Sequence, residues 1–557
     1  MEPPSELRRQ LGKLLPSRRD YEALPHTWRT DLIAGVTVGV VALPLALAFG
    51  VASGLGASAG LITAIVAGTL AAVFGGSHVQ VSGPTGAMTV VLAPVVLKFG
   101  IDGVLVVTAL AGIMLIAAGA IRLGRLIRLL PWPLIEGFTL GIGAIIFLQQ
   151  VPVALGVPMP DNENTAVRAL AAIADAGAAN WHAIALSLIV AIAMIAIPRI
   201  HRSAPASLLG VAAATLIAVA TGWQVSEIGT IATSLPAPNL PGFNWGELSG
   251  LLGAAVSIAA LAAIESLLSA RVADGMADTD HHDPDRELVG QGVANLGSSL
   301  FGGMPATGAI ARTAVNVRAG GRTRAAAIVH SAVLVVVMLV LSPLVASIPL
   351  AALAGVLMVT AVHMVEFGTI GRILRSTRGD AAVLLTTAFA TLAFDLVVAV
   401  EIGLVIAILV ALHSVASETR FEEDDLRSVD IDVETEHQLL HDHVVVYQLD
   451  GALFFGAAQR FLLELADVSD VRWAVLRLGK LRVLDATGAR AIGDLVERLE
   501  SRGISVILTS VRAEHRRLID GVGAMHTLDQ EHRIVPGIQE ALAMTRSSAP
   551  DHARSAA

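Results

Sequence analysis

Two short polar segments interrupt the hydrophobic part of the chain, and each combines glycine and proline with a small hydroxyl side chain. They read SGPTGAM over residues 82–88 and PATGAIART over residues 305–313. They occupy corresponding places in two successive halves, and paired interrupted helices of this kind point to the binding site of a transporter built from inverted repeats. If both segments begin half-helices near the middle of the membrane, their free N–H groups and positive dipole ends suit an anion. The glycines could instead serve only close helix packing, but their pairing favours an anion site.

Arg312 lies inside the second segment, where a charge is costly enough that it normally faces a cavity or a partner. We expect it to contribute positive potential at the anion site. The alternative is a structural ion pair, or a side chain that reaches toward the membrane surface near Arg318.

Glu265 is the other charge deep within a hydrophobic run, and Ser269 follows it by one helical turn on the same face. A carboxyl group at such a place can load and release a proton during transport. The carboxylate and the hydroxyl could instead hold sodium, or Glu265 could pair with Arg312 or Arg271 for structure alone. We predict that Glu265 and Ser269 bind the coupling cation, a proton or sodium.

The remaining polar signals favour ordinary roles. The Asp and His cluster at 280–285 fits a solvated loop better than a metal site. His330 and His363 stand near span ends and fit the membrane interface. The sequence holds no catalytic triad, nucleotide-binding loop or metalloprotease motif, so we predict no enzymatic activity and no cofactor beyond the coupling ion.

Composition and hydropathy predict an α-helical polytopic membrane protein. Of the 557 residues 54% are hydrophobic, and the mean hydropathy is +0.70, whereas soluble domains are usually about 45 to 50% apolar. Apolar runs between residues 31 and 415 are long enough to cross roughly 30 Å of hydrocarbon as helices. We predict about fourteen spans in two inverted seven-span repeats: Leu32–Ala52, Ala59–Phe74, Thr85–Lys98, Gly103–Ala120, Pro131–Gln149, Ile184–Ile197, Ala206–Thr221, Leu251–Ala270, Leu288–Phe301, Thr307–Val317, Ala325–Leu341, Pro349–Met364, Ala381–Phe394 and Val397–Ser414.

The charges assign the two sides of the membrane. Arginines follow spans four, six, eight, ten and twelve, and cytoplasmic loops carry an excess of Lys and Arg. The loops after spans five and seven are acidic, and the basic first thirty or so residues lack the pattern of a cleavable signal. We therefore expect both termini in the cytoplasm and a location in the inner (plasma) membrane. The net charge of −9 argues against nucleic acid as a partner, and zero cysteines exclude disulfides and thiolate metal sites.

After residue 415 the composition changes to a charged linker and then to a soluble α/β pattern. Val444–Leu449, Trp473–Leu478 and Ile504–Leu508 are predicted strands, and Ala489–Arg502 is a predicted helix. Strands that alternate with helices predict a small parallel sheet. The predicted division is a cytoplasmic N-terminal segment (1–30), a transmembrane anion transport domain (31–415), a linker (416–440), an α/β domain (441–545) and a disordered tail (546–557).

The chain resembles the sulfate permease family of anion transporters, which carry a C-terminal STAS domain. The motifs behind the resemblance are DLIAGVTVGVVALP at 31–44, GPT at 83–85, ATGAIARTA at 306–314 and DATG at 485–488. The resemblance implies fourteen spans in two inverted halves, a core domain that moves against a gate domain, and a homodimer. It also implies a small anion held between spans one, three, eight and ten.

Carried over by motif, the anion site comprises Ala42, Phe49, Thr85, Ala309, Ile310, Ala311 and Arg312, and Glu265 matches the acid of span eight. The sodium-dependent bicarbonate members are similar through spans one to three but have an aspartate at the position of Glu265. They also have a threonine at the position of Ile310 and no arginine at that of Arg312. Members with Glu and Arg at these positions resemble proton-coupled carriers of sulfate or C4-dicarboxylates.

We therefore predict secondary-active, proton-coupled transport of an anion of the sulfate or C4-dicarboxylate class by alternating access. The alternatives are a sodium-dependent bicarbonate symporter and an anion exchanger or channel. In the STAS domain, Thr487 stands where related anti-sigma antagonists have a phosphorylatable Ser or Thr, so it is a candidate for regulation through a partner. Its alternative role is a helix N-terminal turn in which Asp485 and Thr487 satisfy backbone donors.

Overall fold

The structure of the chain is a computed structural model that describes residues 14–125, 131–158, 164–201, 204–242, 246, 248–277, 279–393, 402–403, 405–406, 409, 420–423, 444–453, 471–484, 486–521, 528 and 532–547. The chain divides into two compact units, Met1–Val405 and Ile406–Ala557. The first is called the membrane unit and the second the C-terminal unit.

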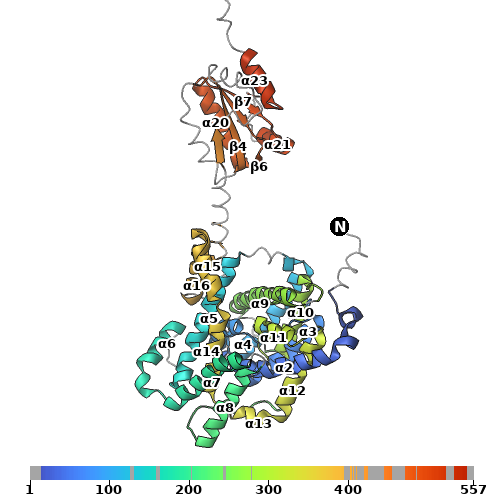
Figure 1. Cartoon of the computed structure of the whole chain (residues 1–557), viewed down its shortest axis with the longest axis vertical. Helices are drawn as coiled ribbons and strands as arrows, with labels where there is room; N and C mark the ends of the chain where they lie inside the picture. The colour runs from blue at the N-terminus through green and yellow to red at the C-terminus, as the bar shows by residue number, and fades with distance from the viewer. Residues whose placement is uncertain are drawn as a thin grey trace, which may run out of the picture. The chain divides into compact units, whose positions relative to one another are not determined.

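The membrane unit consists mainly of α-helices, because only backbone that is hydrogen-bonded internally is stable in hydrocarbon. Among the residues described, seven helical stretches are long and apolar enough to cross a bilayer. The helices, shown in Figure 1, are α2 (Leu24–Ala52), α3 (Ala57–Phe74), α4 (Gly86–Ala120), α5 (Trp132–Leu155), α6 (Thr165–Ala174), α7 (Trp181–Ile200), α8 (Ala206–Thr221), α9 (Leu248–Met276), α10 (Pro284–Leu300), α11 (Ile310–Arg318), α12 (Arg324–Val340), α13 (Ser342–Ala346), α14 (Leu350–Met364), α15 (Phe367–Arg375) and α16 (Arg378–Ala393).

These helices follow the predicted spans with a few differences. Spans three and four are parts of α4, which is divided at Gly100, where φ is 68°. Helices α6 and α15 occupy segments that were predicted as loops, because about ten residues are too few to register as a span in a hydropathy pattern. The predicted span Val397–Ser414 lies outside the described residues apart from a few helical positions.

The helices of the membrane unit pack as two bundles. Helices α2, α3, α4, α9, α10, α11 and α12 pack mainly on one another and are called the core bundle. Helices α5, α7, α8, α14 and α16 also pack mainly on one another and are called the gate bundle. The bundles meet where α14 and α8 pack on α2 and where α5 packs on α4.

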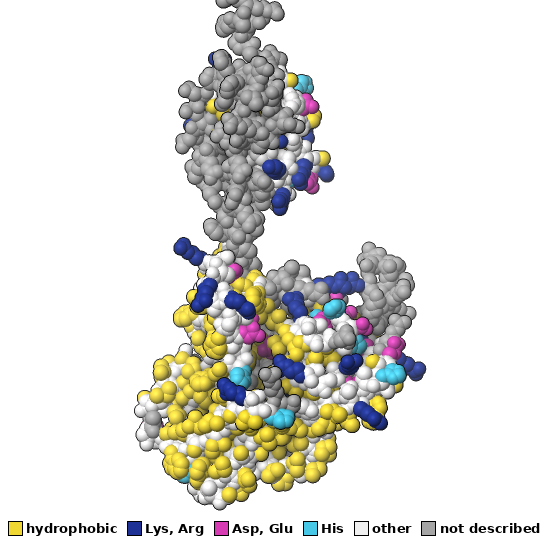
Figure 2. Space-filling model, in the orientation of Figure 1, with side chains coloured by type: hydrophobic (Ala, Val, Ile, Leu, Met, Phe, Trp, Pro, Cys, Tyr) yellow, Lys and Arg dark blue, Asp and Glu magenta, His cyan; other side chains and the backbone are white. Residues whose placement is uncertain are grey.

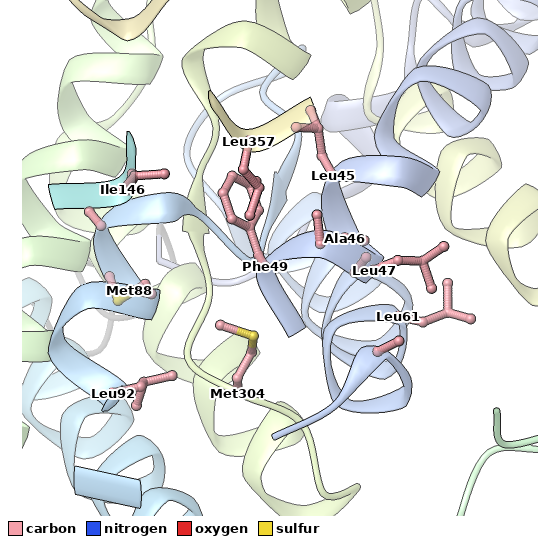
Figure 3. Close-up of a cluster of buried hydrophobic side chains, with 14 of the residues drawn as sticks. Leu45, Ala46, Leu47, Phe49, Leu61, Met88, Leu92, Ile146, Met304 and Leu357 are labelled. Carbon is pink, nitrogen blue, oxygen red and sulfur yellow. The ribbon is translucent and has the colours of Figure 1, made fainter. Parts of the chain in front are cut away.

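Hydrophobic side chains fill the contact between the two bundles. Figure 3 shows Phe49 of α2 extending toward Leu357 of α14, with Ile146 of α5 and Met88 of α4 nearby. All four are buried in the same cluster. The contact is therefore apolar and holds no fixed ion pair among these residues, which suits surfaces that move against each other.

The outer surface of the membrane unit is apolar as well. Figure 2 shows hydrophobic side chains covering most of the visible face over α7 and α8, and Ile192, Ile195 and Leu216 are among the exposed ones. Such extended apolar surface is unusual for a protein in water and is typical of contact with lipid.

Charged side chains tie the N-terminal segment to the core bundle. The Asp20 carboxylate, in the 3-10 turn Arg18–Tyr21, accepts hydrogen bonds from Nη1 and Nη2 of Arg286 at 2.9 and 2.7 Å. Nη2 of Arg324 lies 3.7 Å from the same carboxylate. Burial would raise the pKa of Asp20, but the bonds from Arg286, a backbone amide and the charge of Arg324 together lower it to about 2. The N-terminal segment, α10 and α12 therefore meet on one side of the unit, which agrees with the pattern of arginines.

The C-terminal unit is a small α/β domain, as predicted. Its sheet has the order β3 (Arg420–Glu423), β4 (Val444–Leu453), β5 (Trp473–Arg477), β7 (Ser505–Thr509) and β8 (Ile534–Val535), with β6 (Leu481–Leu484) beside β4. All pairings are parallel except that of β3 with β4. Strand β3 lies within the segment 416–440 that was predicted as a linker.

Successive residues of the central strands face opposite sides of this sheet. Leu476 of β5 packs in a cluster with Leu495 of α20 (Ala486–Ser501) and Ile519 of α21 (Ala513–Gly521). Its neighbour Val475 packs in the cluster that contains Leu542 of α23 (Ile538–Ser547). Helices therefore cover both faces of the sheet.

The ion pairs of Asp20 predict a pH-dependent contribution to stability. The folded-state pKa is lowered from 3.8 to about 2, so the contribution is complete above about pH 4 and is lost as the pH falls through 2. We expect Asp20→Asn to lower the free energy of unfolding at pH 7 by roughly 2 to 4 kcal/mol, measured by thermal unfolding in detergent. Glu22→Gln, at a nearby exposed acid, is the control. Equal stability of Asp20→Asn and the unmodified protein at pH 7 would contradict this assignment.

Candidate anion-binding site

The two interrupted segments meet inside the core bundle. Strand β1 (Ser82–Gly83) pairs antiparallel with β2 (Thr307–Gly308). Helix α4 begins just after β1 and α11 just after β2. Neither N-cap residue, Thr85 or Ala309, caps its own helix with a side chain. Two helix starts with uncapped N–H groups therefore lie close together, and such groups attract anions.

Side chains from three other helices hold this strand pair in place. Ser266 of α9 hydrogen-bonds Oγ1 of Thr307 at 2.8 Å and accepts the next backbone N–H at 3.0 Å. Gln291 of α10 donates to Oγ of Ser82 at 2.7 Å, and Thr313 of α11 accepts the backbone N–H that precedes β1 at 3.1 Å. The strands are thus fixed by small polar side chains that are themselves buried.

These supporting residues were not singled out from the sequence. The available signal is a pair of polar residues three or four positions apart on an otherwise apolar helix, which places both on one face. The pairs are Ser266 with Ser269, Gln291 with Asn295, and Thr313 with Asn316.

Thr85 and Glu265 form the polar contact that joins the two halves of the site. Oγ1 of Thr85 donates to Oε2 of Glu265 at 2.9 Å, across 180 positions of sequence. Both side chains are partly exposed. Glu265 has no salt bridge to Arg312 or Arg271 among the pairs that the described residues form. The carboxylate is therefore held by a neutral hydroxyl.

Arg312 reaches back toward β1 from the first turn of α11. It is 2% exposed, and its Nη2 donates to the carbonyl oxygen of Pro84 at 3.2 Å. Nη1 has no hydrogen-bond partner in the described part of the chain. A Cβ at Gly83 would collide with this nitrogen and lie 3.6 Å from Cα of Ala64. The guanidinium group therefore depends on the missing side chain at Gly83, and its charge has no acidic partner in the described structure.

The other predicted site residues occupy different surroundings. Ala309 is partly exposed, and Ile310 and Ala311 are exposed, with 44% of Ile310 accessible. Ala42 and Phe49 of α2 are buried. Cε1 of Phe49 would lie 3.2 Å from a Cβ at Gly86, so this ring packs beside the start of α4. The structure thus places Phe49, Thr85, Glu265 and Arg312 near the two helix starts. Ala42 lies in α2, the helix of Phe49, and is buried there.

Ser269 has a partner other than Glu265. Its hydroxyl is fully buried and lies 3.2 Å from Oγ1 of Thr313. The two residues proposed to share a cation therefore make separate contacts in this structure.

The histidines divide into two kinds. His363 is exposed, as expected for an interfacial position, whereas the interfacial placement of His330 is wrong, because His330 is 0% exposed in α12. The loop His282 bonds Asp274 through Nδ1 at 2.6 Å. No group of three or more His, Asp or Glu side chains suited to a metal occurs in the described residues. Thr487 lies in the first turn of α20, but its side chain and Asp485 fall outside the described parts.

Comparisons with known proteins bear on both units. The family model described as the sulfate permease family matches residues 28–387, and that of the STAS domain matches residues 437–541. The Bacillus subtilis protein YvdB, which has a sulfate-transporter name, is 33% identical over 514 residues, or 91% of this chain and 96% of YvdB.

Two solved structures share the fold. The transmembrane domain of the cyanobacterial bicarbonate transporter BicA is 34% identical, with a TM-score of 0.61 over 69% of this chain and 97% of that domain. The murine anion transporter Slc26a9, in its inward-facing state, has a TM-score of 0.81 over 97% of this chain and 95% of that one, at 19% identity. These likenesses confirm the predicted fold class, a helical membrane protein of about fourteen spans in inverted repeats followed by a STAS domain.

The crowding of Arg312 against β1 predicts a sharp effect of adding one methyl group. We expect Gly83→Ala to displace the buried guanidinium and to reduce anion uptake by the purified protein in liposomes at least tenfold. Gly253→Ala is the matched control, because a Cβ at this helical glycine meets nothing within 4 Å. If Gly83→Ala takes up the anion as fast as Gly253→Ala does, transport does not require Arg312 at the position that it has in the structure.

Proposed function

The chain belongs to the sulfate permease family, and we propose that it carries a sulfate or C4-dicarboxylate anion together with a proton by alternating access. The family consists of anion transporters and not enzymes, and the chain is a multi-pass membrane protein. The substrate class and the coupling ion are the proposal. The observation that carries it is the Thr85–Glu265 hydrogen bond at the start of α4.

The hydrogen bond that Glu265 makes with Thr85 supports coupling to a proton. Its one hydrogen-bond partner among the described side chains is Thr85, and a hydroxyl can either donate to a carboxylate or accept from a carboxylic acid. The contact can therefore persist whether or not Glu265 carries a proton. A sodium ion would need several oxygen ligands, and Ser269, the second one proposed, bonds Thr313 instead.

The charges at the site favour a doubly charged anion as the substrate. Arg312 is buried without an acidic partner in the described structure, and two uncapped helix starts lie beside it. A dianion gains more from this fixed positive potential than a monoanion does. An ionised Glu265 would repel it, so binding of the anion and protonation of Glu265 favour each other, and this coupling is reciprocal.

The two bundles provide the moving parts. Thr85, Glu265 and Arg312 all belong to the core bundle, so they can move together without changing their mutual contacts. The gate bundle contributes Ile146, which a Cβ at Gly86 would meet at the start of α4. Sliding of the apolar contact between the bundles would uncover the site to one side of the membrane and then to the other.

A sodium-dependent bicarbonate symporter is the second candidate. It is favoured by the 34% identity to the transmembrane domain of BicA, which is named a bicarbonate transporter. The differences at Glu265, Ile310 and Arg312 weigh against it.

Three further assignments belong to this proposal. Both termini lie in the cytoplasm and the protein resides in the inner (plasma) membrane, because Arg125, Arg286 and Arg324, which follow even-numbered predicted spans, lie together and pair with Asp285 or Asp20. The protein acts as a homodimer. A regulatory partner binds the STAS domain, with Thr487 as the candidate for modification.

Uptake of labelled sulfate, fumarate and bicarbonate into proteoliposomes tests substrate and coupling together. We expect saturable accumulation of sulfate or fumarate that follows an inward proton gradient, because the anion and the proton favour each other's binding. Sodium-driven bicarbonate uptake would instead support the second candidate. Flux that does not saturate and follows no cation gradient would indicate a channel and contradict both.

Replacement of Glu265 tests the coupling group. Glu265→Gln keeps the size and a hydrogen bond to Thr85 but holds no exchangeable charge. We expect it to lose proton-driven accumulation while keeping exchange of anions across the membrane, both measured in the same proteoliposomes. Glu136→Gln is the control, because Glu136 of α5 is partly exposed and bonds Trp132. Full proton-driven accumulation by Glu265→Gln would refute the role of Glu265.

A further inference from the structure

His330 is a buried polar side chain for which the transport mechanism above has no role. It lies in the middle of α12 and is 0% exposed. Neither ring nitrogen forms a well-aligned hydrogen bond with any residue that the structure describes. By contrast, His282 in the loop before α10 and His182 in the first turn of α7 contact Asp274 and Asn180 through Nδ1. Buried polar groups without partners are rare in native proteins and call for an explanation.

The surroundings of His330 place it beside β1. A Cβ built at Gly68 of α3 would lie 3.7 Å from Cε1 of His330, 2.9 Å from Oγ of Ser331 and 3.2 Å from the carbonyl oxygen of Ser82. Ser331 in turn donates to the carbonyl oxygen of Ala64 at 3.3 Å. The ring, α3 and β1 therefore converge on the space that the missing side chain of Gly68 leaves.

The side chain of Arg312, in α11, lies against the same strand β1. Its Nη1, which lacks a partner, lies against Gly83, and Ala64 borders the same spot. Two buried polar groups without partners in the described structure thus flank the Ser82–Gly83 backbone of β1, one beside Gly68 of α3 and the other beside Gly83.

Their hydrogen-bonding capacities are complementary. A neutral imidazole carries its proton on one ring nitrogen. The other ring nitrogen then keeps a lone pair, whereas Nη1 of Arg312 has only protons to offer. A lone pair and an N–H group on the two sides of β1 can be joined by one buried water held by polar neighbours such as Ser331.

We propose that His330 is a positioning residue for Arg312, accepting a hydrogen bond from Nη1 through one buried water. Nη2 is held by Pro84 and Nη1 by His330, so the guanidinium plane is fixed beside the starts of α4 and α11. The role of His330 is to keep the charge of Arg312 where the anion binds. This inference rests on the proposed function.

The test compares variants of His330 in proteoliposome uptake. His330→Leu removes the acceptor, and we expect the KM for the transported anion to rise about tenfold with kcat within about twofold, which corresponds to about 1.4 kcal/mol of anion binding. His330→Gln restores an acceptor at similar reach and should return KM to within about threefold of the unmodified protein. A residue that only fills space would change the melting temperature and show no rescue by Gln.

His363→Leu is the matched control, because His363 is exposed in another helix of the same unit. If His330→Leu does not fold, His330→Met takes its place, because methionine fills irregular apolar space. An unchanged KM in the apolar variant overturns the proposal, and so does misfolding of both apolar variants while His330→Gln folds. Failure of the unmodified protein to transport sulfate, fumarate or bicarbonate is a separate result, which rejects the proposed function itself.

Discussion

The membrane unit depends on one constraint: backbone N–H and C=O groups within hydrocarbon must find partners inside the protein. The continuous helices satisfy this automatically, but the two interrupted segments cannot. The antiparallel pairing of β1 with β2, two residues on each side, satisfies part of the need. Side chains of α9, α10 and α11 satisfy further backbone groups: Ser266 accepts from the N–H of Gly308, Thr313 accepts from that of Val81, and Asn295 bonds both the N–H and the C=O of Ala306. In the described structure the N-cap side chains leave the first turns of α4 and α11 uncapped, and N–H groups at such helix starts are available to an anion.

This arrangement explains why small residues and hydroxyls gather around the strand pair. Glycine at 83 leaves room for the guanidinium of Arg312, and Gly308 leaves room for the side chain of Gln80. Hydroxyl groups of Ser and Thr can donate and accept within a few ångströms of their own backbone, so they fit between closely spaced chains. Short polar contacts therefore hold the helices of the core bundle together, whereas the contact between the core bundle and the gate bundle is apolar. Polar contacts of fixed geometry favour rigid movement of the core, and an apolar interface without directional bonds permits that movement.

Glu265 and Arg312 give the site its chemistry because they are close to the same helix starts but not paired with each other. A direct ion pair would neutralise both and leave little potential for a ligand. Held instead by Thr85 and by the carbonyl of Pro84, each remains responsive to what binds between them. Charges that are satisfied internally lie at the end of the unit, where Asp20 binds Arg286 and lies near Arg324. Acidic and arginine side chains thus form stabilising ion pairs at the end of the unit, whereas at its centre Glu265 and Arg312 remain available to bind a proton and an anion.

The sequence by itself determined the properties that depend on neighbours along the chain. Hydropathy located the spans, the positions of glycine and proline located the two interrupted segments, and short apolar runs located strands β4, β5 and β7. The placement of Glu265 and Arg312 within apolar runs marked them as functional candidates.

Only the tertiary structure decided which groups meet, because hydrogen-bond partners are chosen by proximity in space. Thr85 and Glu265 are 180 positions apart, and no local pattern announces their contact. Ser269, one turn from Glu265, turned out to bond Thr313. His330 was assigned to the interface because span ends are polar, yet it is buried, since its burial depends on how α12 packs against α2 and α3. The sequence also did not predict the short amphipathic helices α6 and α15, because their stability comes from packing on neighbouring helices and not from a long apolar run.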